Sequence, residues 1–461
     1  MTVQIVFAIL FSFLLLKPNP QGLNYQGDLH YVSDVNFHYD LTYMDQGEQK
    51  VEQQIFEQFF MAIDEAETFI LMDMFLFYDS IKITSPHILI ATDLTNRLIA
   101  KKKDKPDINI VVITDPFNTS YGADIPEHLE RLKAAGIAVV ITDLKKLRDS
   151  NPLYTTIWRS CIQWFGTKGK GWLPNVADPD GDKVTLRSYL SLLNFKANHR
   201  KVLLTDKIGI IGSANPHGLS SIHSNIAFSF KGPILADLEE SERAVLTFSD
   251  FLWPSYFNAD QVSTGNVGIQ LITEKKIKDQ LIRSFDSTVE GDSIDIAMFY
   301  LSSRGIIRSL KRAAKRDVTI RLILDANKDA FGRQKGGVPN RPVASELVRR
   351  SKQDIQVRWY NTQGEQFHSK LVLVSQSDRI TIFGGSANLT RRNIHNYNLE
   401  ANVKIMADKD SLITSEVTSY FNDLWLNRGG SYTLDYDVYK SNSILKTVRY
   451  RFQEFSGLST F

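Results

Sequence analysis

The chain has 461 residues, 43% hydrophobic and 23% charged, a balance typical of a globular protein long enough for two or three domains. Its formal net charge of +2 argues against a protein that binds nucleic acid through a strong basic excess. Cys161 is the only cysteine, which excludes an internal disulfide and a zinc site built on cysteines.

The N-terminal segment is strongly apolar. Residues 3–16 are interrupted only by Gln4 and Ser12, and Lys17-Pro18 ends the run. Fourteen residues are fewer than the roughly 20 that a membrane-spanning helix needs. Three interpretations remain: a signal peptide, an anchor whose start is missing from the sequence, or a helix in the membrane interface. Each predicts that residues 1–22 are a separate segment and that the protein is membrane-associated or exported.

The next part of the chain alternates between helix and strand. An amphipathic helix is predicted for residues 53–68 and a strand for residues 69–77. A basic helix over residues 93–103 and a strand over residues 108–115, ending in Asp115, follow. This alternation predicts an α/β fold with a partly parallel sheet.

The same succession of elements recurs in the second half. Its predicted helices and strands are, in order, residues 276–289, 294–301, 305–316 and 318–325, the last ending in Asp325. A polar stretch with two glycines, residues 258–268, is the predicted linker. We therefore expect two homologous α/β domains, residues 27–257 and 269–461. Asp115 and Asp325, at matching strand ends, are either site residues or N-caps of the next helix.

The first half carries extra residues. From Asp115 to His199 the chain runs 84 residues, whereas from Asp325 to His368 it runs only 43, which places an insertion near residues 148–188. The insertion combines aromatic residues with lysines: Tyr154, Trp158, Trp164, Phe165, Lys168, Lys170 and Trp172. That composition suits a surface that contacts lipid, or an extra subdomain packed on the core.

Each half contains one copy of a chemical cassette. The first reads His199-Arg-Lys201-Val-Leu-Leu-Thr-Asp206 and continues to Gly212-Ser213-Ala-Asn215. The second reads His368-Ser-Lys370-Leu-Val-Leu-Val-Ser375 and continues to Gly384-Gly385-Ser386-Ala-Asn388. In a strand, a spacing of two points the histidine and the lysine to the same face. The apolar runs after each lysine predict a hairpin that brings His, Lys, Ser and Asn together.

These residue types suit phosphate chemistry without a metal. Imidazole serves as a nucleophile or as a general acid and base near neutral pH. Lysine is a point charge for phosphoryl oxygens, and serine and asparagine donate neutral hydrogen bonds to them. Two copies supply two histidines, one to attack phosphorus and one to protonate the leaving alcohol.

The doubled pattern resembles the phospholipase D superfamily, with its His-x-Lys-x4-Asp motif followed by Gly-Ser or Gly-x-Asn. The first copy matches fully, and the second has Ser375 at the position of the acid. The resemblance implies two α/β domains related by a pseudo-two-fold axis, one shared active site at their seam, and no metal or organic cofactor. The catalytic residues that it implies are His199, Lys201, Asp206, His368, Lys370 and Glu400. The phosphate-binding residues that it implies are Ser213, Asn215, Ser386 and Asn388.

The roles of the two histidines depend on a third group. The resemblance implies a downstream acid that orients a catalytic histidine, and Glu400, fourteen residues after Ser386, fits. The same spacing in the first half reaches Ala227, so this argument gives the acid to His368. The resemblance instead makes the N-terminal histidine, His199, the nucleophile, which is our expectation. We expect Asp206 to be structural, since it lies at the end of its strand.

The sequence thus predicts a phospholipase D-like phosphatidyltransferase or hydrolase that acts on membrane phospholipids. The apolar terminus and the aromatic insertion favour a cardiolipin-synthase-like enzyme that works through a phosphohistidine. Its expected partners are a phospholipid substrate and a membrane surface, with no nucleic acid, and the chain is expected to be monomeric. The alternatives are a nucleic-acid phosphodiesterase and an inactive, membrane-associated scaffold.

Overall fold

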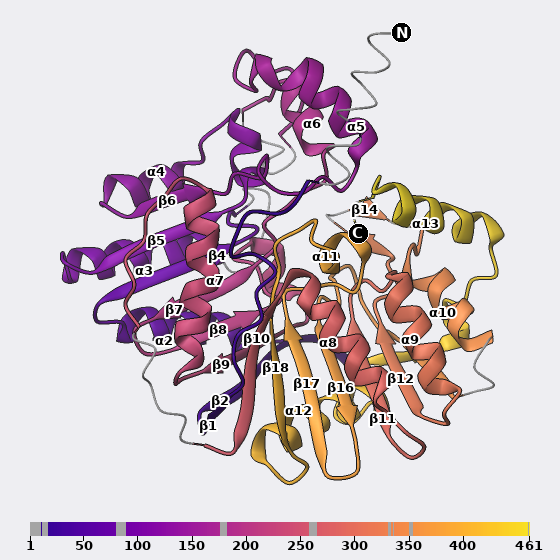
Figure 1. Cartoon of the computed structure of the whole chain (residues 1–461). Helices are drawn as coiled ribbons and strands as arrows, with labels where there is room; N and C mark the ends of the chain where they lie inside the picture. Colours follow the sequence, from indigo (N-terminus) through magenta and orange to yellow (C-terminus); the bar gives the residue numbers. More distant parts are fainter. Residues whose placement is uncertain are drawn as a thin grey trace.

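The computed structural model contains two large mixed β-sheets with helices packed around them (Figure 1). It describes residues 11, 17–79, 89–175, 182–257, 265–330, 333–334, 336–349, 354–459 and 461. Most of the predicted signal or anchor segment, residues 1–22, lies outside these residues, as does most of the predicted linker. Within the described part of the chain, no helix is both long and apolar enough to cross a membrane.

The first sheet has eight strands and carries the first cassette. Their spatial order is β3 (Glu48–Glu52), β2 (Val35–Asp45), β9 (Asn225–Phe230), β8 (Gly209–Gly212), β7 (Lys201–Thr205), β4 (Phe69–Met74), β5 (Asn109–Thr114) and β6 (Ala138–Ile141). Strands β4, β5 and β6 are parallel, and the other pairs are antiparallel. The predicted hairpin of the first cassette is β7 with β8.

The second sheet repeats this arrangement. The order is β1 (His30–Val32), β10 (Val267–Thr273), β18 (Ala401–Asp408), β17 (Arg379–Gly385), β16 (Lys370–Ser375), β11 (Ser293–Met298), β12 (Thr319–Leu324), β15 (Ile355–Tyr360) and β19 (Thr433–Asp435). Seven strands, β10 to β15 in this order, match β2 to β6 of the first sheet one for one. The predicted duplication is therefore present in the topology, and the predicted class of two homologous α/β domains is confirmed.

One strand crosses the predicted domain boundary. Strand β1 pairs with β10, with His30 opposite Ile269, so it extends the second sheet although it precedes every strand of the first. The predicted first domain spans residues 27–257. Its N-terminal strand, β1, therefore belongs to the sheet of the second domain. A short strand pairs with a sheet edge whose backbone N–H and C=O groups are unpaired. The sequence pattern of the strand does not reveal which sheet offers that edge.

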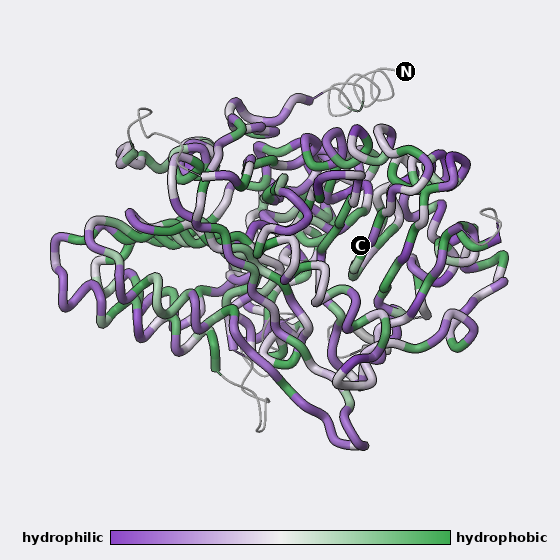
Figure 2. Tube along the Cα trace, turned by 90° about the horizontal axis from the view of Figure 1, so that it is seen from below, coloured by the Kyte–Doolittle hydropathy of each residue, from purple (hydrophilic) through white to green (hydrophobic). Residues whose placement is uncertain are grey.

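Most of the helices pack on the two sheets, whereas two in the first half, within residues 152–192, lie in the insertion (Figure 1). In the first half they are α2 (Ile55–Glu65), α3 (Ile90–Asp104), α4 (Glu127–Ala134), α5 (Pro152–Ile157), α6 (Leu186–Leu192) and α7 (Ile234–Phe248). In the second half they are α8 (Glu274–Asp286), α9 (Arg304–Ala314), α10 (Asn340–Arg349), α11 (Arg391–Ile394), α12 (Leu412–Leu426) and α13 (Ile444–Ser456). The outer helices alternate between hydrophobic and hydrophilic residues along the chain, as helices with one buried face do (Figure 2).

A hydrophobic core joins the two sheets. One cluster of buried side chains contains residues of both, including Phe228 and Val202 from the first and Leu371 and Val403 from the second. The fit is close at Gly384, where an added Cβ would lie 2.3 Å from the ring of Phe228. The extra glycine of the second cassette therefore makes room for a side chain of the first domain. This packing brings the two cassettes together.

Candidate active site

Each cassette places its histidine just before a central strand and its lysine at the first residue of that strand. Lys201 begins β7 and Lys370 begins β16. The Nζ atom of Lys201 donates to the carbonyl oxygen of His199 (2.6 Å), and Nζ of Lys370 donates to that of His368 (2.8 Å). An ammonium group has three donors, so each lysine retains others for a ligand.

Matching side chains support the two histidines. The rings of Phe75 and His199 have centroids 4.9 Å apart, and those of Phe299 and His368 are 5.1 Å apart. Each phenylalanine directly follows a parallel strand, β4 in the first domain and β11 in the second. The two halves therefore build the same hydrophobic wall beside each imidazole.

The two aspartates at matching strand ends fix the backbone before each histidine. Oδ2 of Asp115 accepts from the amide of Asn198 (2.7 Å), and Oδ2 of Asp325 accepts from the amide of Phe367 (2.9 Å). Asp115 also caps the 3₁₀ helix that follows it, by accepting from the amide of Phe117. Burial raises the pKa of both carboxyl groups to about 7. Their observed contacts are structural: they cap a helix or fix the backbone before a histidine.

Hydrogen bonds across the seam hold each histidine against the opposite domain. The amide of His199 donates to the carbonyl of Leu399 (2.9 Å) in the second domain. The amide of Ser224 in the first domain donates to the carbonyl of Gln366 (3.0 Å), two residues before His368. Each histidine segment thus joins a short parallel bridge with the other domain.

The orienting groups also cross the seam. Nδ1 of His199 lies 3.0 Å from the carboxylate of Glu400, and Nδ1 of His368 lies 3.0 Å from Oδ1 of Asn225. The amide nitrogen of Asn225 donates to the carbonyl of His223, so its oxygen faces His368, whose Nδ1 then donates. The spacing argument that gave Glu400 to His368 is therefore wrong. The acid of the second domain orients the histidine of the first.

The two serines serve the orienting groups. The hydroxyl of Ser213 donates to Oδ1 of Asn225 (3.0 Å), and the hydroxyl of Ser386 donates to the carboxylate of Glu400. A hydroxyl has one proton to donate, so neither serine keeps it for phosphate. These contacts show the serines bound to the orienting groups, and their phosphate-binding role stays a prediction. They also show that Asn225, twelve residues after Ser213, is the counterpart of Glu400.

The two asparagines remain candidate phosphate ligands. Oδ1 of Asn215 accepts from the amide of Leu76 (3.3 Å). Oδ1 of Asn388 is buried and has no hydrogen-bond partner among the described residues. Both side chains are almost fully buried. That their amide groups donate to a bound phosphate stays our prediction.

Asp206 lies at the far end of its strand from Lys201. Its Oδ1 accepts from the amides of Glu67 (2.9 Å) and Thr68 (3.2 Å) at the start of β4. Strand β7 separates it from the histidine by its whole length. Its contacts favour the structural role over the predicted catalytic one. Ser375, at the matching end of β16, lies equally far from His368.

Burial lowers the pKa values of both histidines and both lysines, because it disfavours their charged forms. It lowers the pKa of His199 to about 4, against the opposing effect of Glu400, and lowers the pKa of His368 well below its usual range. It also lowers the pKa of Lys201 to about 7 and that of Lys370 well below its usual range. The positive charge of Lys201 contributes to the shift of His368, so the two cassettes lie within electrostatic reach. An anionic ligand would raise all four pKa values.

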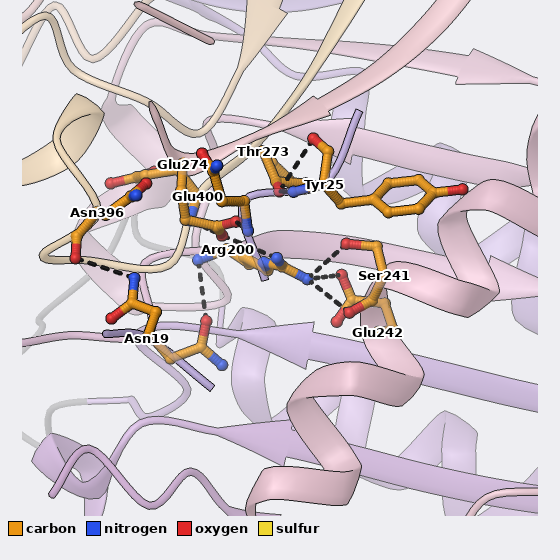
Figure 3. Close-up of polar contacts among 12 residues, drawn as sticks. Asn19, Tyr25, Arg200, Ser241, Glu242, Thr273, Glu274, Asn396 and Glu400 are labelled. Atoms are coloured by element: carbon orange, nitrogen blue, oxygen red, sulfur yellow. Dashed lines mark hydrogen bonds and ion pairs between the residues drawn. The ribbon is translucent and has the colours of Figure 1, made fainter. Parts of the chain in front are cut away.

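A buried arginine supports the site from behind. Arg200 donates through Nη1 to Glu242 (3.0 Å) of the first domain and through Nη2 to Glu274 (2.8 Å) of the second (Figure 3). The same oxygen of Glu274 accepts from the backbone amide of Glu400 (3.1 Å). Arg200 is fully buried and lies between the histidine and the lysine of its motif. It therefore links the backbone of one orienting residue to the opposite domain.

No sequence pattern pointed to Arg200, Glu242, Glu274 or Asn225. The period of a strand turns Arg200 away from the face shared by His199 and Lys201, which indicates only that it is buried or structural. Asn225 was missed because the two halves differ by two residues between serine and orienting group. Among the described residues, no cluster of three His, Cys, Asp or Glu side chains could hold a metal ion.

The insertion is partly packed and partly exposed. Trp158 is buried and lines a cavity of about 170 Å³ between the insertion and the first domain, together with Tyr121 and Lys196. Trp164 and Trp172 are 75% and 64% exposed. The insertion is therefore a packed subdomain that also presents aromatic side chains to solvent.

Comparisons with known proteins agree with this architecture. Residues 281–425 match the family described as "Cardiolipin synthase, PLD-like domain". Phosphatidylserine synthase from Haemophilus influenzae Rd KW20 has a similar structure, with a TM-score of 0.61 and 9% identity over 95% of this chain and 97% of that one. Nuc from Salmonella typhimurium, a phospholipase D family member, aligns with a TM-score of 0.28 and 18% identity over 38% of this chain and 99% of its own. A comparison with curated proteins finds no match in sequence.

These findings establish the fold and a family match over part of the chain. Its fold is that of a two-domain phospholipase D-like protein, and the predicted resemblance to the phospholipase D superfamily is confirmed. The family match lies in the second half of the chain, over residues 281–425.

Proposed function

We propose that this protein is a phosphatidyltransferase or phosphodiesterase of membrane phospholipids, with one active site between His199 and His368. The observation that carries the proposal is the crossed pair of contacts, His199 with Glu400 and His368 with Asn225. Each domain orients the histidine of the other, so neither half is complete alone. The cardiolipin-synthase-type match favours transfer to a second phospholipid alcohol over hydrolysis.

His199 is the nucleophile in this proposal. The Nδ1 proton of His199 is directed to Glu400, so the lone pair of the imidazole is on Nε2. The low pKa of His199 keeps Nε2 unprotonated at neutral pH. Nε2 forms a bond to phosphorus while the bond from phosphorus to the leaving alcohol oxygen breaks. The positive charge that develops on the imidazole is stabilised by the Glu400 carboxylate.

His368 is the general acid and then the general base in this proposal. Bound phosphate raises its pKa, so it enters the reaction as the imidazolium and donates a proton to the leaving oxygen. The neutral ring then accepts a proton from the incoming alcohol or water, which attacks phosphorus and releases His199. Lys201, Lys370, Asn215 and Asn388 hold the phosphoryl oxygens throughout.

Membrane engagement is part of the proposal. The exposed Trp164 and Trp172 suit contact with lipid, and burying one such ring at an interface contributes on the order of 1–3 kcal/mol. We therefore expect that changing both to Ala weakens vesicle binding and lowers activity on bilayer lipid more than on a soluble short-chain substrate. Equal losses on both substrates would mean that the insertion supports the site and does not contact lipid.

A lipid-mixture assay read by mass spectrometry tests the activity. Purified protein is incubated with phosphatidylglycerol, phosphatidylethanolamine and a free alcohol, and the products are identified. A phosphatidyl group on a new alcohol indicates transfer, and phosphatidic acid indicates hydrolysis. No phospholipid turnover, together with cleavage of single-stranded DNA or of bis(p-nitrophenyl) phosphate alone, would favour the nucleic-acid phosphodiesterase. No turnover of any phosphodiester would favour the inactive scaffold.

A further inference from the structure

Helix α13 turns polar side chains inward and apolar side chains outward. Its buried residues are Tyr450 and Glu454. The hydroxyl of Tyr450 donates to Glu346 (3.0 Å), and a carboxylate oxygen of Glu454 accepts from the hydroxyl of Ser302 (2.7 Å). The helix is therefore attached to the second domain by these hydrogen bonds and by the Tyr450 ring, which is buried in the core of that domain. An amphipathic helix on a globular protein normally buries its apolar face instead.

The apolar side chains of α13 form one exposed stripe. At about 100° per residue, five of them fall within an arc of roughly 100°. Their exposed fractions are 77% for Ile444, 82% for Leu445, 59% for Val448, 59% for Phe452 and 84% for Phe455. Single exposed apolar residues are common on proteins, whereas a contiguous stripe marks a contact surface.

Positive charge borders this stripe. Arg449 and Arg451 are exposed on its two sides, and Lys446 lies on the same helix. The one acid of the helix, Glu454, faces the protein interior. Arg451 also donates to Glu346 (3.1 Å). An apolar stripe flanked by basic side chains is typical of helices that lie in the interface of an anionic membrane.

The position of α13 connects the stripe with the candidate active site. Glu454 accepts from the amide of Arg391 (2.9 Å), three residues after Asn388 of the second cassette. Gly457, the residue after the helix, packs so closely on Ser150 that an added Cβ would lie 2.1 Å from the Ser150 carbonyl oxygen. Ser150 belongs to the insertion, so the C-terminal end of α13 contacts the first residues of that segment.

We propose that α13 is a membrane-docking helix that binds anionic phospholipid bilayers and continues the exposed aromatic surface of the insertion. The inference rests on the proposed function for the choice of a phospholipid surface. A second copy of the chain fits this surface less well, because a symmetric contact would bring Arg449 and Arg451 close to the same residues of the other copy. Docking through α13 would hold the seam between the two domains close to the lipid headgroups.

A fluorescent reporter on the helix tests the contact directly. Cys161 is the only cysteine and is exposed, so a Cys161→Ser background allows one label at Phe455→Cys and, as a control, one at Leu412→Cys. Leu412 is 73% exposed and begins α12, which lies at the opposite end of the second domain from α13 (Figure 1). With vesicles of phosphatidylcholine and phosphatidylglycerol, NBD at position 455 should shift to the blue and brighten. NBD at position 412 should not change. The reporter reads α13 itself, whatever the N-terminal segment binds.

A pair of substitutions then measures what the contact contributes. Phe452→Gln with Phe455→Gln should weaken binding of the full chain to the same vesicles by at least about tenfold, because two large apolar side chains no longer enter the interface. Arg449→Gln should weaken binding to anionic vesicles but leave the weaker binding to phosphatidylcholine alone unchanged. The matched controls, Leu412→Gln and Lys409→Gln, should bind like the parent. Turnover of a soluble short-chain substrate should stay at the parent level in all variants.

The outcomes separate this inference from the proposed function. If the label at position 455 does not respond to vesicles while phospholipid turnover is normal, docking through α13 is wrong and the activity stands. If the label responds but no phospholipid is turned over, docking stands and the proposed function is wrong. A label that shifts with protein concentration in the absence of vesicles, with a dimer in size-exclusion chromatography, would identify the stripe as a contact between copies and overturn the inference.

Discussion

The two halves of the molecule hold their histidines in matching frameworks but with different charges. Each imidazole packs on a phenylalanine, each lysine donates to the carbonyl of its histidine, and each serine donates to an orienting group. The orienting group is a carboxylate for His199 and a neutral amide for His368. A carboxylate stabilises an imidazolium, whereas an amide only fixes the tautomer.

The difference between the orienting groups suits His199 and His368 to different steps of the reaction. A histidine that becomes positively charged when it attacks phosphorus benefits from a carboxylate behind it. A histidine that must give up its proton benefits from a neutral partner, because its imidazolium is then the stronger acid. The asymmetry therefore favours His199 as the nucleophile and His368 as the acid. The spacing argument, which assigned Glu400 to His368, had favoured the reverse.

The largest expected effect distinguishes the two histidines. His199→Asn should lower turnover by at least about 10⁴-fold, because no nucleophile remains. His368→Asn should cost about 10²–10⁴-fold, the usual contribution of a general acid. Quenching the reaction of labelled phospholipid should trap an acid-labile phosphohistidine in the parent and in His368→Asn. An adduct that persists in His199→Asn and disappears in His368→Asn would reverse the assignment.

The sequence predicted the parts of the site that lie close together along the chain. The His-x-Lys spacing, the hairpins and the strand ends are local patterns, and the structure places them as expected. The orienting contacts join residues 201 and 143 positions apart, across two domains. A repeat in sequence leaves open whether a group serves its own half or the other. The packing of the two sheets on each other, which places Phe228 against Gly384, brings the orienting group of each domain to the histidine of the other.

The next largest effect concerns Arg200, which has no charged counterpart in the second half, where Ser369 takes its place. Arg200→Met should lower the free energy of unfolding by about 3–5 kcal/mol, because Glu242 and Glu274 keep their burial and lose their shared partner. Ser369→Ala should change it by less than about 1 kcal/mol. Urea denaturation of both variants measures the difference. Equal losses would show that the buried ion pairs contribute nothing beyond packing.

Exchanging the orienting groups tests the division of work at a smaller scale. Glu400→Gln should slow turnover by about 10–100-fold, since the imidazolium of His199 loses its counter-charge but keeps a hydrogen bond. Asn225→Asp should raise the pKa of His368, because an adjacent carboxylate favours the charged ring. Since the reaction needs His368 protonated, the alkaline limb of the kcat profile should move to higher pH. An unmoved limb in Asn225→Asp would mean that His368 is not the acid.

Ser375 gives the smallest expected effect and tests where the comparison ends. Ser375→Asp restores the acid that the first half has at Asp206, yet it should change turnover by less than about tenfold, or roughly 1.4 kcal/mol of barrier. The reason is geometric: Asp206 contacts the amides of Glu67 and Thr68, and Ser375 lies at the same far end of its strand. There it pairs with Ser293, next to the buried Asp292, so a new carboxylate would act mainly on stability. A gain in turnover well above tenfold would show that the second cassette is impaired as it stands, and that the scaffold alternative describes this half better.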